Sequence, residues 1–129
     1  MDAEAISLQE SNSDLPLLLL VEDNPIALKI LESVVTQAHC GFISATTGEK
    51  ALELAKTQHF DMIISDLGLP GISGNTLTYA IRELEKKSGY PPLPIIGLTA
   101  HAVDVAQQES LQAGMNKVLT KPIQLKELQ

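Results

Sequence analysis

Apolar runs and helical apolar spacings alternate five times along this chain. The apolar runs are expected to form strands over residues 17–21, 42–45, 62–65, 95–98 and 117–119. An unbroken run such as residues 17–21 is typical of a parallel strand that is buried on both faces. The alternation therefore predicts an α/β protein with a doubly wound, five-stranded parallel sheet.

The segments between the strands have the spacing of helices. The first helix is expected to start at Pro25, after Asn24 as its N-cap, and to end at Gly41. Its apolar face is predicted to contain Ile26, Ile30, Leu31, Val34, Val35 and Ala38. Further helices are expected over 46–58, from about 77 to 87, over 103–113 and over 125–129, the last one short or truncated. The apolar face of the fourth is predicted to contain Val103, Ala106 and Leu111.

The pattern indicates one domain over residues 15–129, preceded by a polar tail or linker over residues 1–14. The apolar run that begins at Leu15 is far too short to cross a bilayer, which needs about 20 residues. The acidic start of the chain does not resemble a secretory signal. We therefore expect a cytoplasmic domain without direct membrane contact, although its parent chain can be an inner-membrane sensor.

Composition narrows the class of protein. The 129 residues carry a formal net charge of −7, which argues against a nucleic-acid-binding surface. The single cysteine, Cys40, permits no internal disulfide and is expected to be a small buried side chain. Aromatic residues make up only 3% of the chain, so the core is predicted to consist of Leu, Ile, Val and Ala.

Polar residues whose side chains can take part in catalysis or ligand binding follow four of the five strands. Glu22 and Asp23 follow the first, Asp66 the third, Thr99 the fourth and Lys121 the fifth. The carboxyl ends of parallel strands lie on one edge of a sheet, where open α/β sheets bind ligands. The sequence thus predicts three carboxylates, a hydroxyl and an ammonium around one crevice.

Three adjacent carboxylates repel one another unless a cation compensates them. Mg²⁺ prefers oxygen ligands and is typically held by carboxylates together with phosphate oxygens. A lysine and a threonine hydroxyl can each bind an anionic oxygen. The set suits a phosphoryl group bound on Asp66, with its carboxylate as nucleophile. Taken singly, Glu22 and Asp23 fit a solvated turn, Thr99 a helix cap and Lys121 a surface lysine.

With these residues at these spacings, the chain resembles the response regulator receiver domain, above all the receivers of hybrid sensor histidine kinases. The order and spacing of the matching segments cover about residues 15 to 129. The matching segments are Val21-Glu22-Asp23-Asn24, residues 66–74, Leu98-Thr99-Ala100-His101-Ala102, Ala113-Gly114-Met115-Asn116 and Lys121-Pro122.

The resemblance implies a flavodoxin-like strand order of 2-1-3-4-5 and phosphoryl transfer from a phosphohistidine to Asp66. It implies Mg²⁺ (or Mn²⁺) on Asp23, Asp66 and the Gly68 carbonyl, with Glu22 acting largely through water. It also implies that Thr99 and Lys121 bind phosphoryl oxygens, and that the Lys121–Pro122 peptide is cis. Ala100 and His101 would lie at the rim. The implied partners are a histidine kinase domain, a histidine phosphotransfer protein, or both.

One position departs from the family. Receivers often carry an aromatic three residues before the lysine, and here that switch position is Val118. Three alternatives stay open: a free-standing single-domain response regulator, a non-phosphorylated interaction module of the same fold, and a flavin- or nucleotide-binding protein. The last is disfavoured because the turn after the first strand, residues 22–25, is acidic and would repel phosphate.

Overall fold

The computed structural model describes residues 15–100 and 104–128. Strands and helices alternate along the chain, as the apolar pattern predicts. The elements are β1 (Leu17–Val21), α2 (Pro25–Gln37), β2 (Gly41–Ala45), α3 (Gly48–Thr57), β3 (Met62–Asp66), α4 (Gly74–Ser88), β4 (Ile95–Thr99), α5 (Asp104–Ala113), β5 (Lys117–Thr120) and α6 (Leu125–Leu128). The tail over 1–14 and the ends predicted at Val103 and Gln129 lie outside the described residues.

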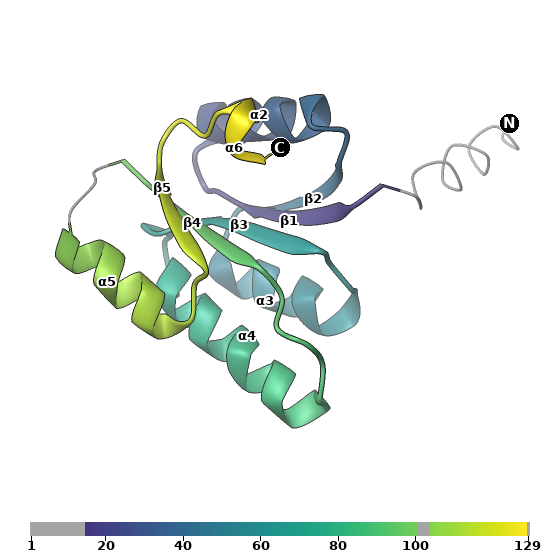
Figure 1. The fold of residues 1–129 in the computed structure, drawn as a ribbon, viewed down its shortest axis with the longest axis vertical. Helices are drawn as coiled ribbons and strands as arrows, with labels where there is room; N and C mark the ends of the chain where they lie inside the picture. The colour runs from purple at the N-terminus through teal and green to yellow at the C-terminus, as the bar shows by residue number, and fades with distance from the viewer. Residues whose placement is uncertain (1–14, 101–103, 129) are drawn as a thin grey trace, which may run out of the picture.

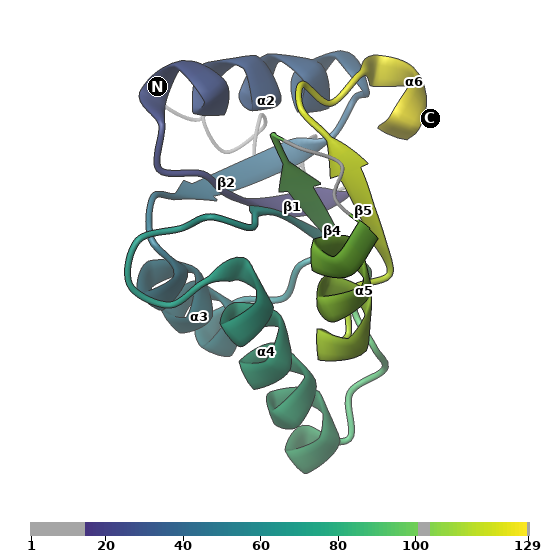
Figure 2. The same cartoon turned by 90° about the vertical axis from the view of Figure 1, so that its left-hand side faces the viewer.

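The five strands form one parallel sheet in the order β2-β1-β3-β4-β5. This arrangement confirms the predicted doubly wound, flavodoxin-like sheet. Helices α2 and α6 cover one face, and α3, α4 and α5 cover the other (Figure 1). The view turned by 90° has the same three layers (Figure 2). All five strands therefore end at one edge of the sheet.

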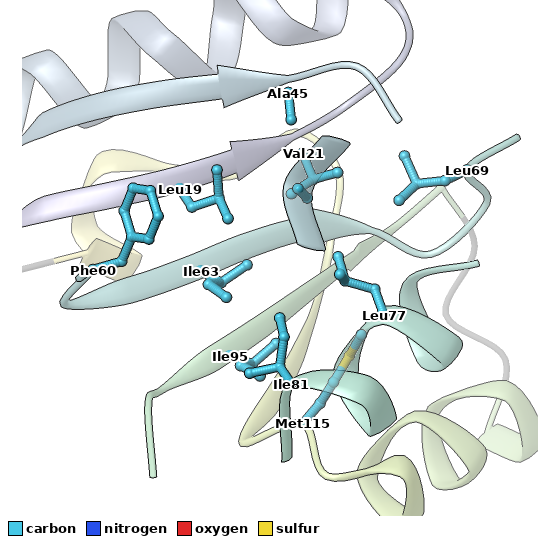
Figure 3. Packing of buried hydrophobic residues seen from close by; sticks show 11 residues of the cluster. Leu19, Val21, Ala45, Phe60, Ile63, Leu69, Leu77, Ile81, Ile95 and Met115 are labelled. Atoms are coloured by element: carbon cyan, nitrogen blue, oxygen red, sulfur yellow. The ribbon is translucent and has the colours of Figure 1, made fainter. Parts of the chain in front are cut away.

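Alternate residues of the central strands build two cores. Leu18 and Leu20 of β1 face α2 and α6, whereas Leu19 and Val21 face α3 and α4. Figure 3 shows the cluster that contains Leu19 and Val21, where β1, β3 and β4 meet α4. Phe60 and Met115 also lie in this cluster, so the core is not restricted to the four residue types expected. Burial on both faces explains why the strands are continuously apolar.

Helix boundaries follow local capping. The Asn24 side chain accepts hydrogen bonds from the amides of Ile26 and Ala27, which confirms the predicted N-cap of α2. That helix ends at Gln37, earlier than predicted, and His39 adopts a left-handed φ of 63°. Gly41 cannot end the helix because it already pairs with Leu17 as the first residue of β2.

Three expectations about burial are wrong. Ile26 and Ile30 of α2 are 73% and 46% exposed, because α2 packs on the sheet through Leu31 and Val35 instead. Leu111 of α5 is 46% exposed, since the buried position on that helix belongs to Ser110. Cys40 is half-buried rather than fully buried.

Candidate functional site

The sheet brings the predicted residues together at its carboxyl edge. Asp66 is the last residue of β3, and Glu22 and Asp23 follow the neighbouring β1. On the other side of β3, Thr99 ends β4, and Lys121 follows β5. Strand register sets these neighbours side by side, since Val21 pairs with Ser65 and Asp66 with Leu98.

Three carboxylates form the centre of the site. Glu22, Asp23 and Asp66 each offer an oxygen atom, and these oxygens lie within 4.8 Å of one another. Glu22 is 2% exposed and Asp66 is 8% exposed, whereas Asp23 is open to solvent. The cluster therefore has two buried members and one that solvent, or a ligand, can reach.

Glu22 is held in place by three contacts. Its Oε1 lies 2.8 Å from Lys121 Nζ, and its Oε2 accepts a hydrogen bond from the Asn24 amide at 3.1 Å. Its own amide donates to the carbonyl of Ala45 on β2 at 3.1 Å. A carboxylate fixed in this way is suited to orienting neighbouring groups. The Asn24 amide is a site contact that the sequence, which indicates only a cap at Asn24, does not reveal.

Lys121 connects two of the carboxylates. Its Nζ also lies 3.3 Å from Asp66 Oδ1, and its amide donates to the Thr99 carbonyl at 2.8 Å. Partial burial acts to lower the pKa of the ammonium, but the hydrogen bond to Glu22 and the charges of Asp66 and Glu22 outweigh burial and raise this pKa above the ordinary lysine value. Lys121 is therefore a cation at neutral pH. The peptide bond between Lys121 and Pro122 is cis.

The loop after Asp66 opens on one side of the site. The Leu67 amide donates to the Leu98 carbonyl at 3.0 Å, which continues the β3–β4 pairing past Asp66. Gly68 is exposed, and a Cβ built there would meet no atom within 4 Å. Gly68 therefore lies on an open surface of the loop.

The remaining predicted residues lie on the β4 and β5 side. Thr99 is half-buried and Ala100 is exposed. His101 lies outside the described residues, so its predicted place at the rim stays a prediction. Val118 is half-buried and packs against the cluster beneath α3 and α4, and not among the carboxylates.

The donor set fits a hard divalent cation. All side-chain donors in the cluster are carboxylate oxygens, the ligand type that Mg²⁺ prefers. Among the residues that the structure describes, three carboxylates face the one ammonium of Lys121, so the cluster keeps an excess of negative charge that one divalent ion would compensate. Glu22, Asp23 and Asp66 are thus able to hold such an ion directly or through water.

A groove of about 630 Å³ lies at the opposite edge of the sheet, away from this cluster. It is lined by Phe60, by Tyr90 and by the proline-rich segment 91–94. The grouped carboxylates and Lys121 are not part of it. Size alone therefore does not identify the chemical site in this fold. No helix in the described part of the chain is long and apolar enough to cross a membrane.

The family profile of the response regulator receiver domain matches residues 18–129. The chain is 36% identical over 117 residues to the sensor histidine kinase GacS of Pseudomonas protegens, covering 91% of this chain and 13% of that protein. It is 33% identical over 115 residues to the sensor histidine kinase RcsC of Escherichia coli, covering 89% of this chain and 12% of that protein. The chain thus spans only a small part of these relatives.

Solved structures give the same match. One is a co-crystal structure of a histidine phosphotransfer signaling protein with the receiver domain of its downstream response regulator, from Saccharomyces cerevisiae (TM-score 0.81, 32% identity, 88% of this chain and 83% of that chain). Another is the receiver domain of a sensor histidine kinase from Pseudomonas aeruginosa, with a magnesium ion coordinated in its active site cleft (TM-score 0.78, 35% identity, 88% and 91%).

Proposed function

The chain belongs to the response regulator receiver domain family, and from that premise we propose that Asp66 accepts the phosphoryl group of a phosphorelay. The observation that carries the proposal is the placement of Asp66. It ends a buried strand, lies beside two further carboxylates, and is 3.3 Å from the ammonium of Lys121. A carboxylate kept next to like charges gains nothing for packing, so a chemical role explains it better.

The proposed step is an in-line displacement. An Oδ of Asp66 attacks the phosphorus of a phosphohistidine, a bond from that oxygen to phosphorus forms, and the phosphorus–nitrogen bond of the donor breaks. The electron pair of the broken bond stays on the imidazole nitrogen, which takes up a proton. The product is an acyl phosphate on Asp66 and an unmodified histidine on the donor.

The metal that would serve this step is Mg²⁺, or Mn²⁺ in its place. Asp23, Asp66 and the Gly68 carbonyl would hold it, with Glu22 acting largely through water. When bound, such an ion neutralises charge on the phosphoryl oxygens as the bond to Asp66 forms. Glu22 keeps Lys121 oriented throughout, because their side chains are 2.8 Å apart.

We assign Lys121 and Thr99 to the new phosphoryl oxygens. The Lys121 ammonium would exchange its ion pair with Asp66 Oδ1 for one with a phosphoryl oxygen. This needs only a short displacement, because Nζ already lies 3.3 Å from that carboxylate. Thr99 ends β4 at the same edge, and its hydroxyl would donate to a second oxygen. Movement of Thr99 would shift the segment that follows β4. Val118 cannot contribute the rotation of an aromatic side chain.

Labelling of the full chain tests the acceptor. With acetyl phosphate and Mg²⁺, the wild-type chain should gain one phosphoryl group by intact-mass measurement, and Asp66→Asn should gain none. Asp61→Asn is a matched control, because Asp61 is an exposed carboxylate that precedes the same strand and bonds the Leu17 amide. Undiminished labelling of Asp66→Asn would rule out the assignment.

We infer that the phosphodonor is a histidine kinase domain or a histidine phosphotransfer protein that docks on α2. The donor imidazole must reach Asp66, so its helix has to lie over the rim of the site. Helix α2 starts at that rim, directly after Asp23 and Asn24, and exposes Ile26 and Ile30 one turn apart. An apolar pair beside the site fits the helical surface of such a donor.

Replacing Ile26 by Ser tests this surface. We expect transfer from a phosphorylated histidine phosphotransfer protein to slow about tenfold, the effect of losing one apolar anchor at an interface. Labelling by acetyl phosphate should not change, because that donor needs no docking. Tyr79→Ser is the matched control, since Tyr79 is 61% exposed on α4, across the sheet. Equal slowing by both variants would contradict docking on α2.

The identity of the relatives supports a parent chain of the hybrid sensor histidine kinase type, in which a receiver accepts the phosphoryl group from a kinase domain. The catalytic core of the kinase would lie outside these residues, and the receiver would face the cytoplasm. A free-standing response regulator would contain Asp66 and its partners in the same arrangement. Sequencing the complete gene distinguishes the two, since only a hybrid kinase encodes a kinase domain in the same chain.

A further inference from the structure

The loop between β3 and α4, residues 67–73, rests tightly against the start of α3. A Cβ built on Gly48, the first residue of α3, would lie 2.5 Å from Ile72 Cγ1 and 2.8 Å from the Ile72 carbonyl oxygen. A Cβ atom essentially never lies so close to another heavy atom, so this contact requires glycine. The loop that follows the phosphoacceptor is therefore held against α3, the helix that precedes β3 in the sequence.

Glu49, the next residue, reaches over the loop from the first turn of α3. Its Oε2 accepts a hydrogen bond from the Ile72 amide at 3.3 Å. Gly71 has a left-handed φ of 75°, and a Cβ built on it would overlap the Glu49 carboxylate. Both the backbone conformation and the close approach explain glycine at position 71.

The two ends of the loop are fixed separately. At its start, the Leu67 carbonyl accepts a hydrogen bond from the Gly74 amide at 3.2 Å. A Cβ on Gly74 would lie 2.6 Å from the Asp66 carbonyl oxygen, so the first turn of α4 is packed onto the acceptor residue. Gly68 lies between this anchor and the contact with Glu49, on an open surface. The position of the Gly68 carbonyl is therefore set by how both anchors hold the loop.

We propose that Glu49 is a positioning residue for the phosphoacceptor site. Its carboxylate holds the loop at Gly71 and Ile72 and thereby fixes the backbone from which the Gly68 carbonyl would reach a bound ion. This inference rests on the proposed function, because it assigns the Gly68 carbonyl to the metal. Glu49 itself binds neither the metal nor the phosphoryl group.

Magnesium binding to the full chain, measured by isothermal titration, tests the role. Loss of the acceptor in Glu49→Ala should raise the Kd for Mg²⁺ about fivefold, the effect of one lost hydrogen bond. Glu49→Gln removes the charge but keeps an acceptor oxygen, so its Kd should stay within about twofold of wild type. Glu53→Ala, one turn further along α3 and exposed, is the matched control and should bind as wild type does.

A second measurement reports on the loop without the metal. Hydrogen exchange of the Ile72 amide should accelerate in Glu49→Ala and stay unchanged in Glu49→Gln and Glu53→Ala, because only the first loses the acceptor. A Glu49→Ala chain that binds Mg²⁺ as wild type does would overturn the proposal. A Glu49→Gln chain as weak as Glu49→Ala would also overturn it, since charge alone would then explain the loss.

Failure of the proposed function gives a different result. In that case the wild-type chain itself would bind no Mg²⁺, and the positioning role would be overturned with it. If Glu49→Ala does not fold, Gly71→Ala takes its place, because its methyl group would displace the Glu49 carboxylate. Gly89→Ala is the control for backbone strain, since Gly89 has a similar φ of 73° and open space around it. Gly71→Ala should raise the Kd for Mg²⁺ about fivefold, and Gly89→Ala should leave it unchanged. Equal Mg²⁺ affinities of the two variants would overturn the proposal.

Discussion

The two edges of the sheet each hold a cluster of charged side chains, and the clusters differ in how completely their charges are matched. At the carboxyl edge, Lys121 pairs with Glu22 and Asp66, and Asp23 adds a third carboxylate to the cluster. At the opposite edge, Arg82 of α4 faces Glu85. Both clusters combine acidic and basic groups, and all of these groups except Asp23 are at least partly buried, so residue type alone does not separate the clusters.

Every donor of the Arg82 guanidinium has an acceptor. Its Nε and Nη2 donate to the Gly114 carbonyl at 3.0 and 2.8 Å, and Nη2 also donates to Asn116 Oδ1 at 2.8 Å. Its Nη1 donates to the Leu93 carbonyl at 2.7 Å and to Glu85 Oε1 at 2.9 Å. Since a guanidinium has five N–H groups, this set satisfies all of them.

The contrast separates a structural cluster from a chemical one. The Arg82 cluster joins α4 to the segments before β4 and β5 and has no capacity for another ligand. The cluster at the carboxyl edge keeps more negative than positive charge, and Asp23 is exposed beside it. A fold can keep such an unbalanced group only where the rest of the domain supplies stability. Function is therefore expected at the edge where charge matching is incomplete.

The largest effect on stability is expected at the matched cluster. Arg82→Met should lower the free energy of unfolding by about 3 kcal/mol, because the Gly114 and Leu93 carbonyls would lose their side-chain donor and the Glu85 carboxylate would keep only its hydrogen bond from the Leu93 amide. Urea unfolding followed by circular dichroism measures the change. Acetyl phosphate labelling of the folded fraction should be unaffected, since the proposed acceptor, Asp66, lies at the other edge of the sheet.

Lys86→Met is the matched control for Arg82→Met. Lys86 lies on the same helix and pairs with Glu83 at 3.6 Å, but its side chain is 76% exposed. An exposed pair contributes about 0.5 kcal/mol or less, so this variant should unfold almost as wild type does. If the two substitutions had equal cost, the Arg82 cluster would not be a structural centre, and the contrast between the edges would disappear.

The carboxyl-edge site could be predicted because it depends on strand ends. Apolar runs locate the strands, parallel pairing places their ends on one edge, and the polar residue after each run then becomes a neighbour of the others. Asp66 and Lys121 are 55 positions apart in the sequence, yet their contact follows from topology alone. Buried strands with short, clear boundaries make this reasoning reliable.

The Arg82 cluster could not be predicted in the same way. Its partners Gly114 and Asn116 lie in a loop, more than 30 positions from Arg82, and no periodicity relates a helix surface to a loop carbonyl. The exposure of Ile26 and Ile30 was missed for a related reason. Helical spacing identifies an apolar stripe, but only packing decides which part of a wide stripe the sheet covers. Glu49 gives no signal beyond an acidic residue in a first helical turn, which the helix dipole alone explains.

A smaller effect, with the opposite sign, is expected at the unmatched cluster. Without Mg²⁺, Asp66→Asn should raise the free energy of unfolding by about 1 kcal/mol, because it removes one of three adjacent negative charges and leaves Lys121 paired with Glu22. With free Mg²⁺ at ten times the Kd, the wild-type chain should gain about 1.4 kcal/mol and Asp66→Asn little, so the order of stability would equalise or reverse. Asp61→Asn, at the opposite edge, leaves the three carboxylates intact and keeps an acceptor oxygen for the Leu17 amide, so its stability should stay close to that of wild type both without Mg²⁺ and with it. Urea unfolding at constant ionic strength, with and without Mg²⁺, measures all three chains. A wild-type chain that is more stable than Asp66→Asn in the absence of Mg²⁺ would mean that the carboxylates already balance, as the groups around Arg82 do, and that the two edges do not differ in kind.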